Sequence, residues 1–214
     1  MNIFILDKNI TLSAQYHCDK HVVKMITESC QILCTVYLAN TNYKSYPDFL
    51  YKPTHTKHPC VLWAGANISN FCYLVELAEA LYNEYQYRYN RPEKHQRNKN
   101  IIDYFKKVLP PLILEKQTPF AQAMPDKYKH DNPVVAYRAY YNGEKHHLFK
   151  WTKRNIPIWI QKIGLKFDKL TTIWYTCRND SYVENSFEFV KAIGGNTYRD
   201  KEYPCATKKQ TEEK

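Results

Sequence analysis

The sequence predicts a mainly α-helical protein. We expect a single-domain helical bundle over residues 1–160, which begins with a short strand or arm, and a mixed, partly ordered extension over residues 161–214. Apolar residues recur at steps of three and four in several long segments, which is the spacing of a half-buried helix. Only 5 of the 214 residues are glycine and 44% are hydrophobic, so the chain favours helices and has enough apolar side chains for a core.

The first predicted elements are an arm and a long helix. Residues 2–6 form a short apolar run that ends at Asp7, typical of a strand or of an extended arm on the core. Asn9 or Thr11 caps the helix, which runs to about Ala39. Its buried face is expected to consist of Val22, Met25, Ile26, Leu33 and Val36.

A long surface loop is expected over residues 40–58, where Asn, Ser and Pro are frequent. Pro59 then lies in the first turn of one or two helices that reach about residue 90, with Asn67 or Ser69 as a second cap. The apolar face of this region is Phe71, Leu74, Val75, Ala78 and Leu81.

Three further segments complete residues 1–160. A shorter helix is predicted around His95–Val108, ended by the two prolines that follow. Residues 114–133 contain three prolines and predict an ordered loop. Asp131 then caps a helix that Pro133 opens and that ends near Trp151.

The net charge of +10, from 31 Lys and Arg against 21 Asp and Glu, favours a polyanionic partner, DNA or another nucleic acid. Residues 91–107 carry six basic against two acidic residues, and residues 144–169 seven against two, so these stretches supply +4 and +5. Aromatic residues are interleaved with the second stretch, a pattern typical of nucleic-acid surfaces. The alternative is a solvated basic face whose aromatic rings point into the core.

The seven cysteines form no CxxC pair, so the sequence indicates neither a zinc knuckle nor a disulfide framework. We expect a reducing cytoplasm, that of the host cell if the protein is viral. The first residues do not resemble a signal peptide, and no apolar run approaches the roughly 18 residues of a membrane span, so no membrane partner is expected. The sequence leaves the oligomeric state open.

Ionisable residues are concentrated in the first predicted helix. His17, His21, Lys24 and Glu28 follow one another at helical spacing, and Asp19 and Lys20 flank them. We predict a catalytic centre here, in which an amine and a carboxylate act on one substrate and a histidine carries protons. The candidate groups are Lys20 or Lys24 as amine, Asp19 or Glu28 as carboxylate, and His21 as proton carrier. The alternative is an ordinary solvated helix face with hydrogen-bonded histidines.

His17 and His21 also have the spacing of two metal ligands on a helix. The glutamate of the HExxH signature is replaced by Cys18, and no third ligand is indicated. We therefore predict no metal and no cofactor.

Further residues are candidates for binding substrate or nucleic acid, because they combine charge or aromatic rings with helical spacing or precede a helix. They are His17, His58, Glu84, Arg88, His95, Arg138, Tyr141, Lys145, Trp151, Lys153 and Arg154. For Glu84 and Arg88 the alternative is an ion pair between residues four apart on one helix.

Two resemblances concern these residues. The strings YHCDKHVVKMI, HPCVLW, TPFAQAMPD and YRAYYNGEK resemble a group of uncharacterised phage-encoded proteins over about residues 1–160. More distantly, the charged first helix, the HP before a second long helix and the E...YRY at its end are similar to pyrimidine-dimer DNA glycosylases of the endonuclease V type.

That second resemblance implies an all-helical protein that cuts the glycosidic bond of a damaged pyrimidine. The family uses an N-terminal amine as nucleophile and an Arg-Glu pair on its first helix. This chain departs from the pattern, because Asn2 replaces the small second residue and the pair falls near Asp19, Lys20 and His21. Three functions remain open: a DNA glycosylase or lyase, a non-catalytic nucleic-acid-binding protein, and an enzyme acting on free nucleotides.

Overall fold

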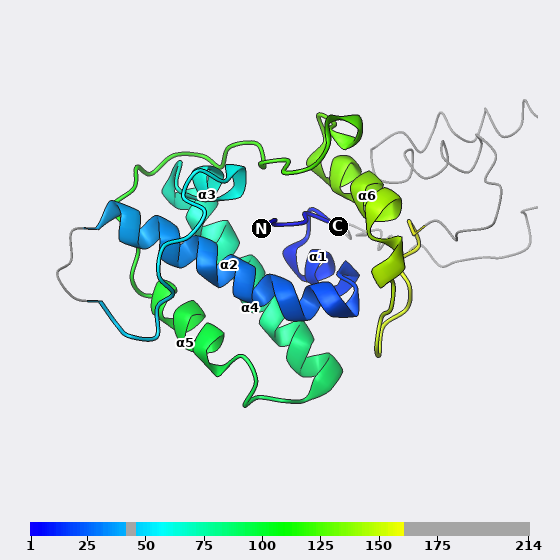
Figure 1. Ribbon diagram of the computed structural model, residues 1–214, viewed down its shortest axis with the longest axis horizontal. Coiled ribbons are helices and arrows are strands. Elements are labelled where there is room, and N and C mark those ends of the chain that lie inside the picture. Colours follow the sequence, from blue (N-terminus) through cyan, green and yellow to red (C-terminus); the bar gives the residue numbers. More distant parts are fainter. Residues whose placement is uncertain (42–45, 161–214) are drawn as a thin grey trace, which may run out of the picture. The chain divides into compact units, whose positions relative to one another are not determined.

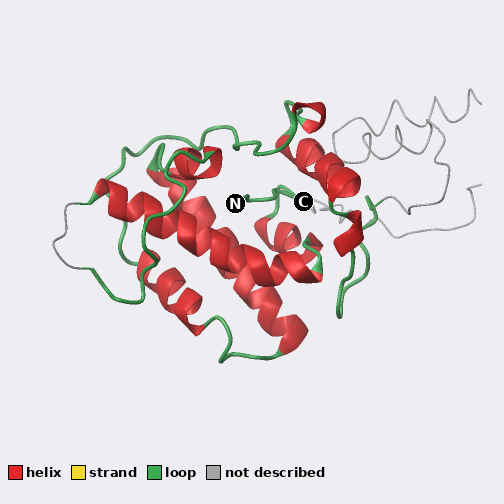
Figure 2. Ribbon diagram, in the orientation of Figure 1, coloured by secondary structure: helices red, strands yellow, loops and turns green. Residues whose placement is uncertain are grey.

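Six α-helices and two short 3-10 helices make up the regular structure of residues 1–41 and 46–160, which are the residues described by this computed structural model. Figure 2 shows no strand in this part of the chain. The prediction of a mainly helical fold is confirmed for these residues. The predicted extension over residues 161–214 lies outside them, and the boundary at residue 160 stays a prediction.

The first nine residues form an extended arm without a strand (Figure 1), and residues 2–6 of this arm are buried. The side chains from Ile3 to Leu6 are almost completely buried. Phe4 has a φ of 37°, a left-handed conformation that is costly for an aromatic residue and that only the surrounding contacts can maintain. The Asn2 side-chain amide donates to Ala123 O and accepts from the Tyr137 hydroxyl, so hydrogen bonds fix the beginning of the arm.

The predicted first helix is wrong in one respect, because it is two helices. α1 spans Ile10–Tyr16 and α2 spans Asp19–Asn40, and Asn9 caps α1 with its side chain. His17 and Cys18 have extended backbone angles and separate the two helices.

Distant partners replace the hydrogen bonds that are lost at this break. In a continuous helix the Cys18 N–H would donate to Ala14; here it donates to the Tyr141 hydroxyl at 3.1 Å. The Asp19 N–H donates to Lys150 O at 2.8 Å. The break is therefore stabilised by residues that follow more than 120 positions later.

The second helical region has the predicted starts. α3 spans Pro59–Ala64 with His58 as N-cap, and α4 spans Ile68–Tyr89 with Asn67 as N-cap. Asn90 ends α4 in a left-handed conformation, which is a common way to terminate a helix.

The core lies where α2 packs along α4, with α1 beside them and α5, Gln96–Phe105, against both (Figure 1). All ten residues predicted to form the apolar faces of these helices are buried: Val22, Met25, Ile26, Leu33, Val36, Phe71, Leu74, Val75, Ala78 and Leu81. By length and hydropathy alone α2 reaches the requirements of a membrane span, which the sequence analysis did not expect. In the fold 61% of its most apolar window is buried against the rest of the chain.

A long connection leads from α5 to α6 and passes α3 (Figure 1), and it includes residues 114–133, which were predicted to form an ordered loop. Its one regular turn is the 3-10 helix η1, Asp126–Tyr128. Asn67 and Asn70 of α4 hold it through bonds to Lys116 O and to Thr118. The connection is therefore fixed to the core by polar contacts.

α6 spans Pro133–Glu144, and two details of its prediction are wrong. Asn132, and not Asp131, is the N-cap, because the Asn132 side chain accepts from the N–H groups of the first turn. The helix also stops well before Trp151, and the 3-10 helix η2, His146–Leu148, follows it.

Candidate active site

Glu28, in the middle of α2, lies between the amino-terminal arm and Lys24. Its Oε2 accepts a hydrogen bond from the Asn2 N–H at 3.1 Å, and its Oε1 forms an ion pair with Lys24 Nζ at 3.0 Å. Only 12% of the Glu28 side chain is exposed, against 67% of the Lys24 side chain. His58 of the α3 cap is near enough for the charge of Glu28 to act on its pKa, although burial lowers that pKa overall. The result is a largely buried carboxylate with an amine on its solvent side.

Asp19, the other candidate carboxylate, has its oxygens occupied. It accepts from Thr152 N–H at 2.9 Å, from Thr152 Oγ1 at 2.7 Å and from Arg88 Nη1 at 2.9 Å. Burial alone would raise the pKa of Asp19, but the bonds from Thr152 and Arg88 outweigh it and the pKa is lowered. This carboxylate holds the segment around Thr152 against the first turn of α2.

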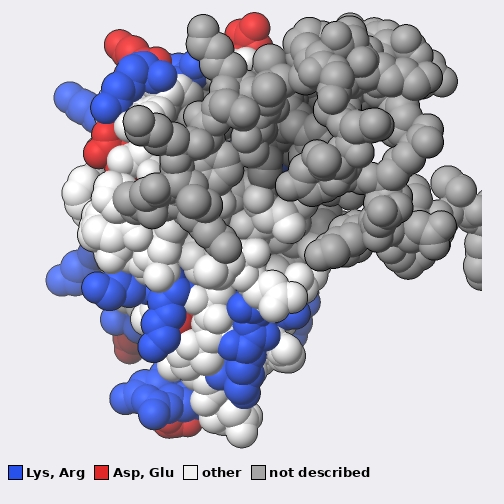
Figure 3. Space-filling view, turned by 90° about the vertical axis from the view of Figure 1, so that its right-hand side faces the viewer, with Lys and Arg blue, Asp and Glu red and all other residues white. Residues whose placement is uncertain are grey.

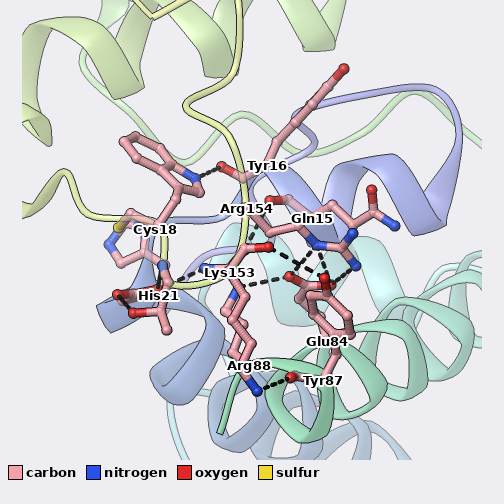
Figure 4. Close-up of polar contacts among 12 residues, drawn as sticks. Gln15, Tyr16, Cys18, His21, Glu84, Tyr87, Arg88, Lys153 and Arg154 are labelled. Carbon is pink, nitrogen blue, oxygen red and sulfur yellow. Dashed lines mark hydrogen bonds and ion pairs between the residues drawn. The ribbon is translucent and has the colours of Figure 1, made fainter.

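Arg88 is the centre of this buried ionic cluster (Figure 4). Its side chain is 0% exposed and donates to Glu84 at 2.7 Å, to Asp19 at 2.9 Å and to the Gln15 backbone oxygen at 2.9 Å. The ion pair between Glu84 and Arg88, which was the alternative to their predicted role in binding, is present. Because the guanidinium is enclosed, Arg88 is not accessible to a nucleic acid in this structure.

Arg154 closes the cluster from the other side. It donates to both oxygens of Glu84, the shortest bond being 2.7 Å, and stacks 4.0 Å above the Tyr87 ring (Figure 4). Lys153 donates to the Tyr87 backbone oxygen at 3.1 Å. These two predicted DNA-binding residues therefore also anchor the segment after α6 to α4.

A pocket of about 360 Å³ adjoins this cluster between α1 and α4. Three glutamates, Glu76, Glu79 and Glu84, line it together with Arg154. This lining is predominantly acidic and would repel a phosphodiester, so the pocket is a poor place for DNA. None of His21, Lys24, Arg88 and Arg138 lines this pocket.

His17 and His21 are buried whereas Lys24 is exposed, so the three residues do not lie together on one accessible face as their spacing predicted. His17 lies in the break between α1 and α2, is completely buried, and has Nδ1 2.7 Å from the Ser13 backbone oxygen. His21 is 5% exposed, and its Nδ1 lies 2.7 Å from the Tyr141 hydroxyl. Phe4 stacks on the His21 ring at 4.6 Å.

Both histidines are neutral near pH 7. Burial lowers the pKa of His17 to about 4. The pKa of His21 is lowered to about 3, mainly by burial and also by electrostatic interactions with the basic side chains of His17, Lys145, Lys24 and His147. A group with so low a pKa does not exchange protons readily near neutrality, which speaks against His21 as the proton carrier.

We expect the protein to lose stability as the pH falls below about 6.5. Both imidazoles are neutral when folded, whereas in the unfolded chain they take up protons below about pH 6.5, so acid favours unfolding. At pH 5 the loss is about 2 kcal/mol for each histidine. Urea unfolding at pH 7.5 and pH 5 measures it. His21→Asn should reduce the difference, and His146→Asn, at an exposed position, should leave it unchanged. An equal pH dependence in both variants would contradict the assignment.

The remaining predicted residues have mixed surroundings. Lys20 is exposed. Arg138 donates to the Leu6 backbone oxygen and to Asp7, so it fixes the arm. Trp151 is buried and donates to the Tyr16 backbone oxygen at 3.0 Å. His95 precedes α5 in a left-handed conformation and bonds to the Asn98 side chain.

Several residues of the two predicted nucleic-acid-binding stretches have partners within the protein or lie in its core. In residues 91–107, Arg97 donates to two backbone oxygens, Lys99 pairs with Asp103 and Lys106 pairs with Glu79. In the second stretch Tyr141, Trp151 and Trp159 are buried, so these aromatic rings belong to the core. Figure 3 nevertheless shows lysine and arginine side chains outnumbering acidic ones on the lower half of the face it presents.

No cluster of three or more His, Cys, Asp or Glu side chains suitable for a metal ion occurs in the described ranges. Three important residues were not singled out from the sequence: Asn2 as a partner of Glu28, Gln15 as a backbone acceptor for Arg88, and Thr152 as the partner of Asp19. Their roles come from contacts between distant positions, and no local pattern marks them.

The described chain is thus a helical protein with a basic surface and a carboxylate flanked by an arm and a lysine. Residues 1–97 match the family model of pyrimidine dimer DNA glycosylases, so the chain distantly resembles that family. The matched segment contains the arm, α1 to α4 and the Glu28 centre. The family indicates an activity like that of pyrimidine-dimer DNA glycosylases, with DNA as substrate. Searches of the curated proteins and of the solved structures gave no significant match.

Proposed function

We propose that this chain is a phage DNA-processing enzyme that acts as a DNA glycosylase and lyase on damaged or modified pyrimidines in the cytoplasm of the host cell. One observation carries the proposal: Glu28 is largely buried and has the Lys24 amine 3.0 Å from one oxygen and the arm 3.1 Å from the other. The family match over residues 1–97 supports it, and the phage-protein motifs support the phage origin.

An amine beside a carboxylate suits the cleavage of a glycosidic bond. The neutral amine attacks C1′ of the sugar, the bond from C1′ to the base breaks, and the base leaves with the electron pair and takes up a proton that the amine releases. The C1′–O4′ bond then opens, O4′ is protonated, and a protonated imine remains. The Glu28 carboxylate stabilises the positive charge that develops at C1′.

Lys24 and Glu28 are better placed for this chemistry than Lys20 and Asp19. Both oxygens of Asp19 already accept hydrogen bonds from Arg88 or Thr152. The carboxylate is therefore held in place and cannot turn toward a positive charge that develops on a substrate. Lys24 is exposed in the free protein, so its amine is accessible to a bound nucleotide.

Borohydride trapping tests the proposal directly. The protein is mixed with duplexes that contain an abasic site, a thymine dimer or a modified pyrimidine, and reduction of the imine gives a covalent adduct. We expect Lys24→Met to abolish the adduct and the matched change Lys20→Met to keep it, with both proteins as stable as the wild type.

Peptide mapping of the adduct identifies the amine. An adduct on residues 1–8 would move the nucleophile to the arm, as in the family, and keep Glu28 as its carboxylate. Binding to every duplex without any adduct or base release would reject the enzyme and leave a nucleic-acid-binding protein.

A further inference from the structure

The segment after α6 is basic and is held against the start of α2. Residues 145–154 contain four Lys or Arg and two His, and no Asp or Glu. Thr152 bonds to Asp19 through N–H and hydroxyl, and the Asp19 N–H donates back to Lys150 O. The position of this segment relative to α2, and therefore to Glu28, is fixed by these bonds.

Lys145, at the beginning of the segment, has no carboxylate at ion-pair distance among the described residues. Its Nζ lies 4.8 Å from the centre of the Tyr140 ring. The adjacent Glu144 is occupied by Lys127 at 3.1 Å and by the Tyr128 hydroxyl at 2.9 Å. The positive charge of Lys145 is therefore not neutralised by an ion pair.

An aromatic stack connects Lys145 with His21. The Phe4 ring lies parallel to that of Tyr140, at 6.1 Å and 9°, and stacks on His21 at 4.6 Å and 28°. The strained backbone of Phe4 is the means by which the arm places its ring in this stack. The stack brings the carboxyl-terminal end of α6 next to the first turn of α2.

The hydrogen bonds of Tyr141 determine which nitrogen of His21 carries the proton. The Tyr141 hydroxyl oxygen accepts from Cys18 N–H at 3.1 Å, and its own proton has two possible acceptors: His21 Nδ1 at 2.7 Å and Cys18 Sγ at 3.5 Å. The imidazole nitrogen is nearer and is the stronger acceptor. The neutral ring of His21 then carries its hydrogen on Nε2, where it is a donor.

Basic side chains from three elements influence His21. Lys24 belongs to α2, and Lys145 and His147 come from the end of α6 and from η2. All three act on His21 in the same direction and lower its pKa, and no carboxylate is among the main influences. The side chains that act on His21 beside the Glu28 centre are therefore basic ones.

We propose that Lys145, His147 and the Nε2–H of His21 bind one phosphate of the DNA strand next to the nucleotide that reacts at Glu28. A phosphodiester supplies the negative charge and the acceptor oxygens that these three donors require. This inference rests on the proposed function, because it takes DNA as the substrate of the Glu28 centre. It identifies Lys145 and His147 as residues that fix the register of the strand.

A thermodynamic cycle tests the contact. Single phosphates on either side of a lesion or abasic site are replaced, one at a time, by uncharged methylphosphonate. Affinities are measured for the wild type, Lys145→Gln, His147→Gln and the control Lys116→Gln, which removes the same charge from an exposed position in the connection before α6. We expect one methylphosphonate to weaken wild-type binding about tenfold at low salt and to have almost no effect on Lys145→Gln. Lys145→Gln should also lower the slope of log K against log salt by about 0.9.

The outcomes separate this inference from the proposed function. If methylphosphonate substitution has the same effect on the affinity of Lys145→Gln and of Lys116→Gln at every position, the phosphate site is overturned. The proposed glycosylase activity would still stand if the wild type forms the borohydride-trapped adduct. A wild type that neither binds DNA nor forms an adduct would overturn both. The inference is supported if the methylphosphonate effect at one position is lost in Lys145→Gln and in His147→Gln but retained in Lys116→Gln.

Discussion

Replacing Glu28 with glutamine is expected to lower the single-turnover rate of base release by roughly 10²–10³-fold. Glutamine keeps the size of the side chain and an oxygen that can accept from the Asn2 N–H. It removes the negative charge that stabilises the sugar cation and the ion pair with Lys24. The rate is measured with enzyme in excess over a lesion-containing duplex, so that product release does not enter.

DNA affinity separates this loss from a loss of binding. Glu28→Gln removes a negative charge from a site that faces a polyanion, so the dissociation constant should stay equal or decrease. Glu115→Gln, at an exposed position, removes the same charge elsewhere and should change neither quantity. A rate for Glu28→Gln within about threefold of the wild type would be a far smaller loss than electrostatic catalysis predicts. Glu28 would then not be the carboxylate of the reaction.

The helical fold was predictable because its signals are local. The starts of α1 and α4 are capped by Asn9 and Asn67, and Pro59 marks the start of α3, so all three starts are visible in the sequence. The break after α1 was not predictable, since neither proline nor glycine marks it. It exists because the Tyr141 hydroxyl and the Lys150 backbone oxygen accept hydrogen bonds from Cys18 N–H and Asp19 N–H, which a continuous helix would satisfy internally.

The candidate site was predictable in part, for the same reason. Lys24 and Glu28 are four residues apart on α2, and this spacing alone brings their charges together. Asp19 and His21 lie equally close in sequence, yet they face Arg88 and Tyr141, which are more than 60 positions away. Burial lowers the pKa of His21, and the neighbouring residues in the sequence do not predict this shift.

Replacing Arg88 with methionine is expected to cause the largest loss of stability among single changes to the ionic cluster, about 3–5 kcal/mol of unfolding free energy. Methionine fills much of the volume but leaves Asp19, Glu84 and the Gln15 backbone oxygen each without one buried donor. For a chain of this size such a loss corresponds to a decrease in Tm of roughly 6–20 °C. Urea unfolding at pH 7.5 measures the free energy and thermal unfolding measures Tm.

Arg91→Met is the matched control, because Arg91 lies just beyond α4 on an exposed stretch and its loss should change the free energy by less than about 0.5 kcal/mol. If Arg88→Met costs no more stability than this control, the cluster does not hold α1, α2 and α4 together.

The Arg88→Met variant also tests whether the cluster positions the DNA contacts. With Arg88 gone, Asp19 loses one of the bonds that orient it toward Thr152, so residues 145–154 are held less firmly against α2. We therefore expect the slope of DNA affinity against salt to decrease in Arg88→Met although the guanidinium itself is buried and contacts no DNA.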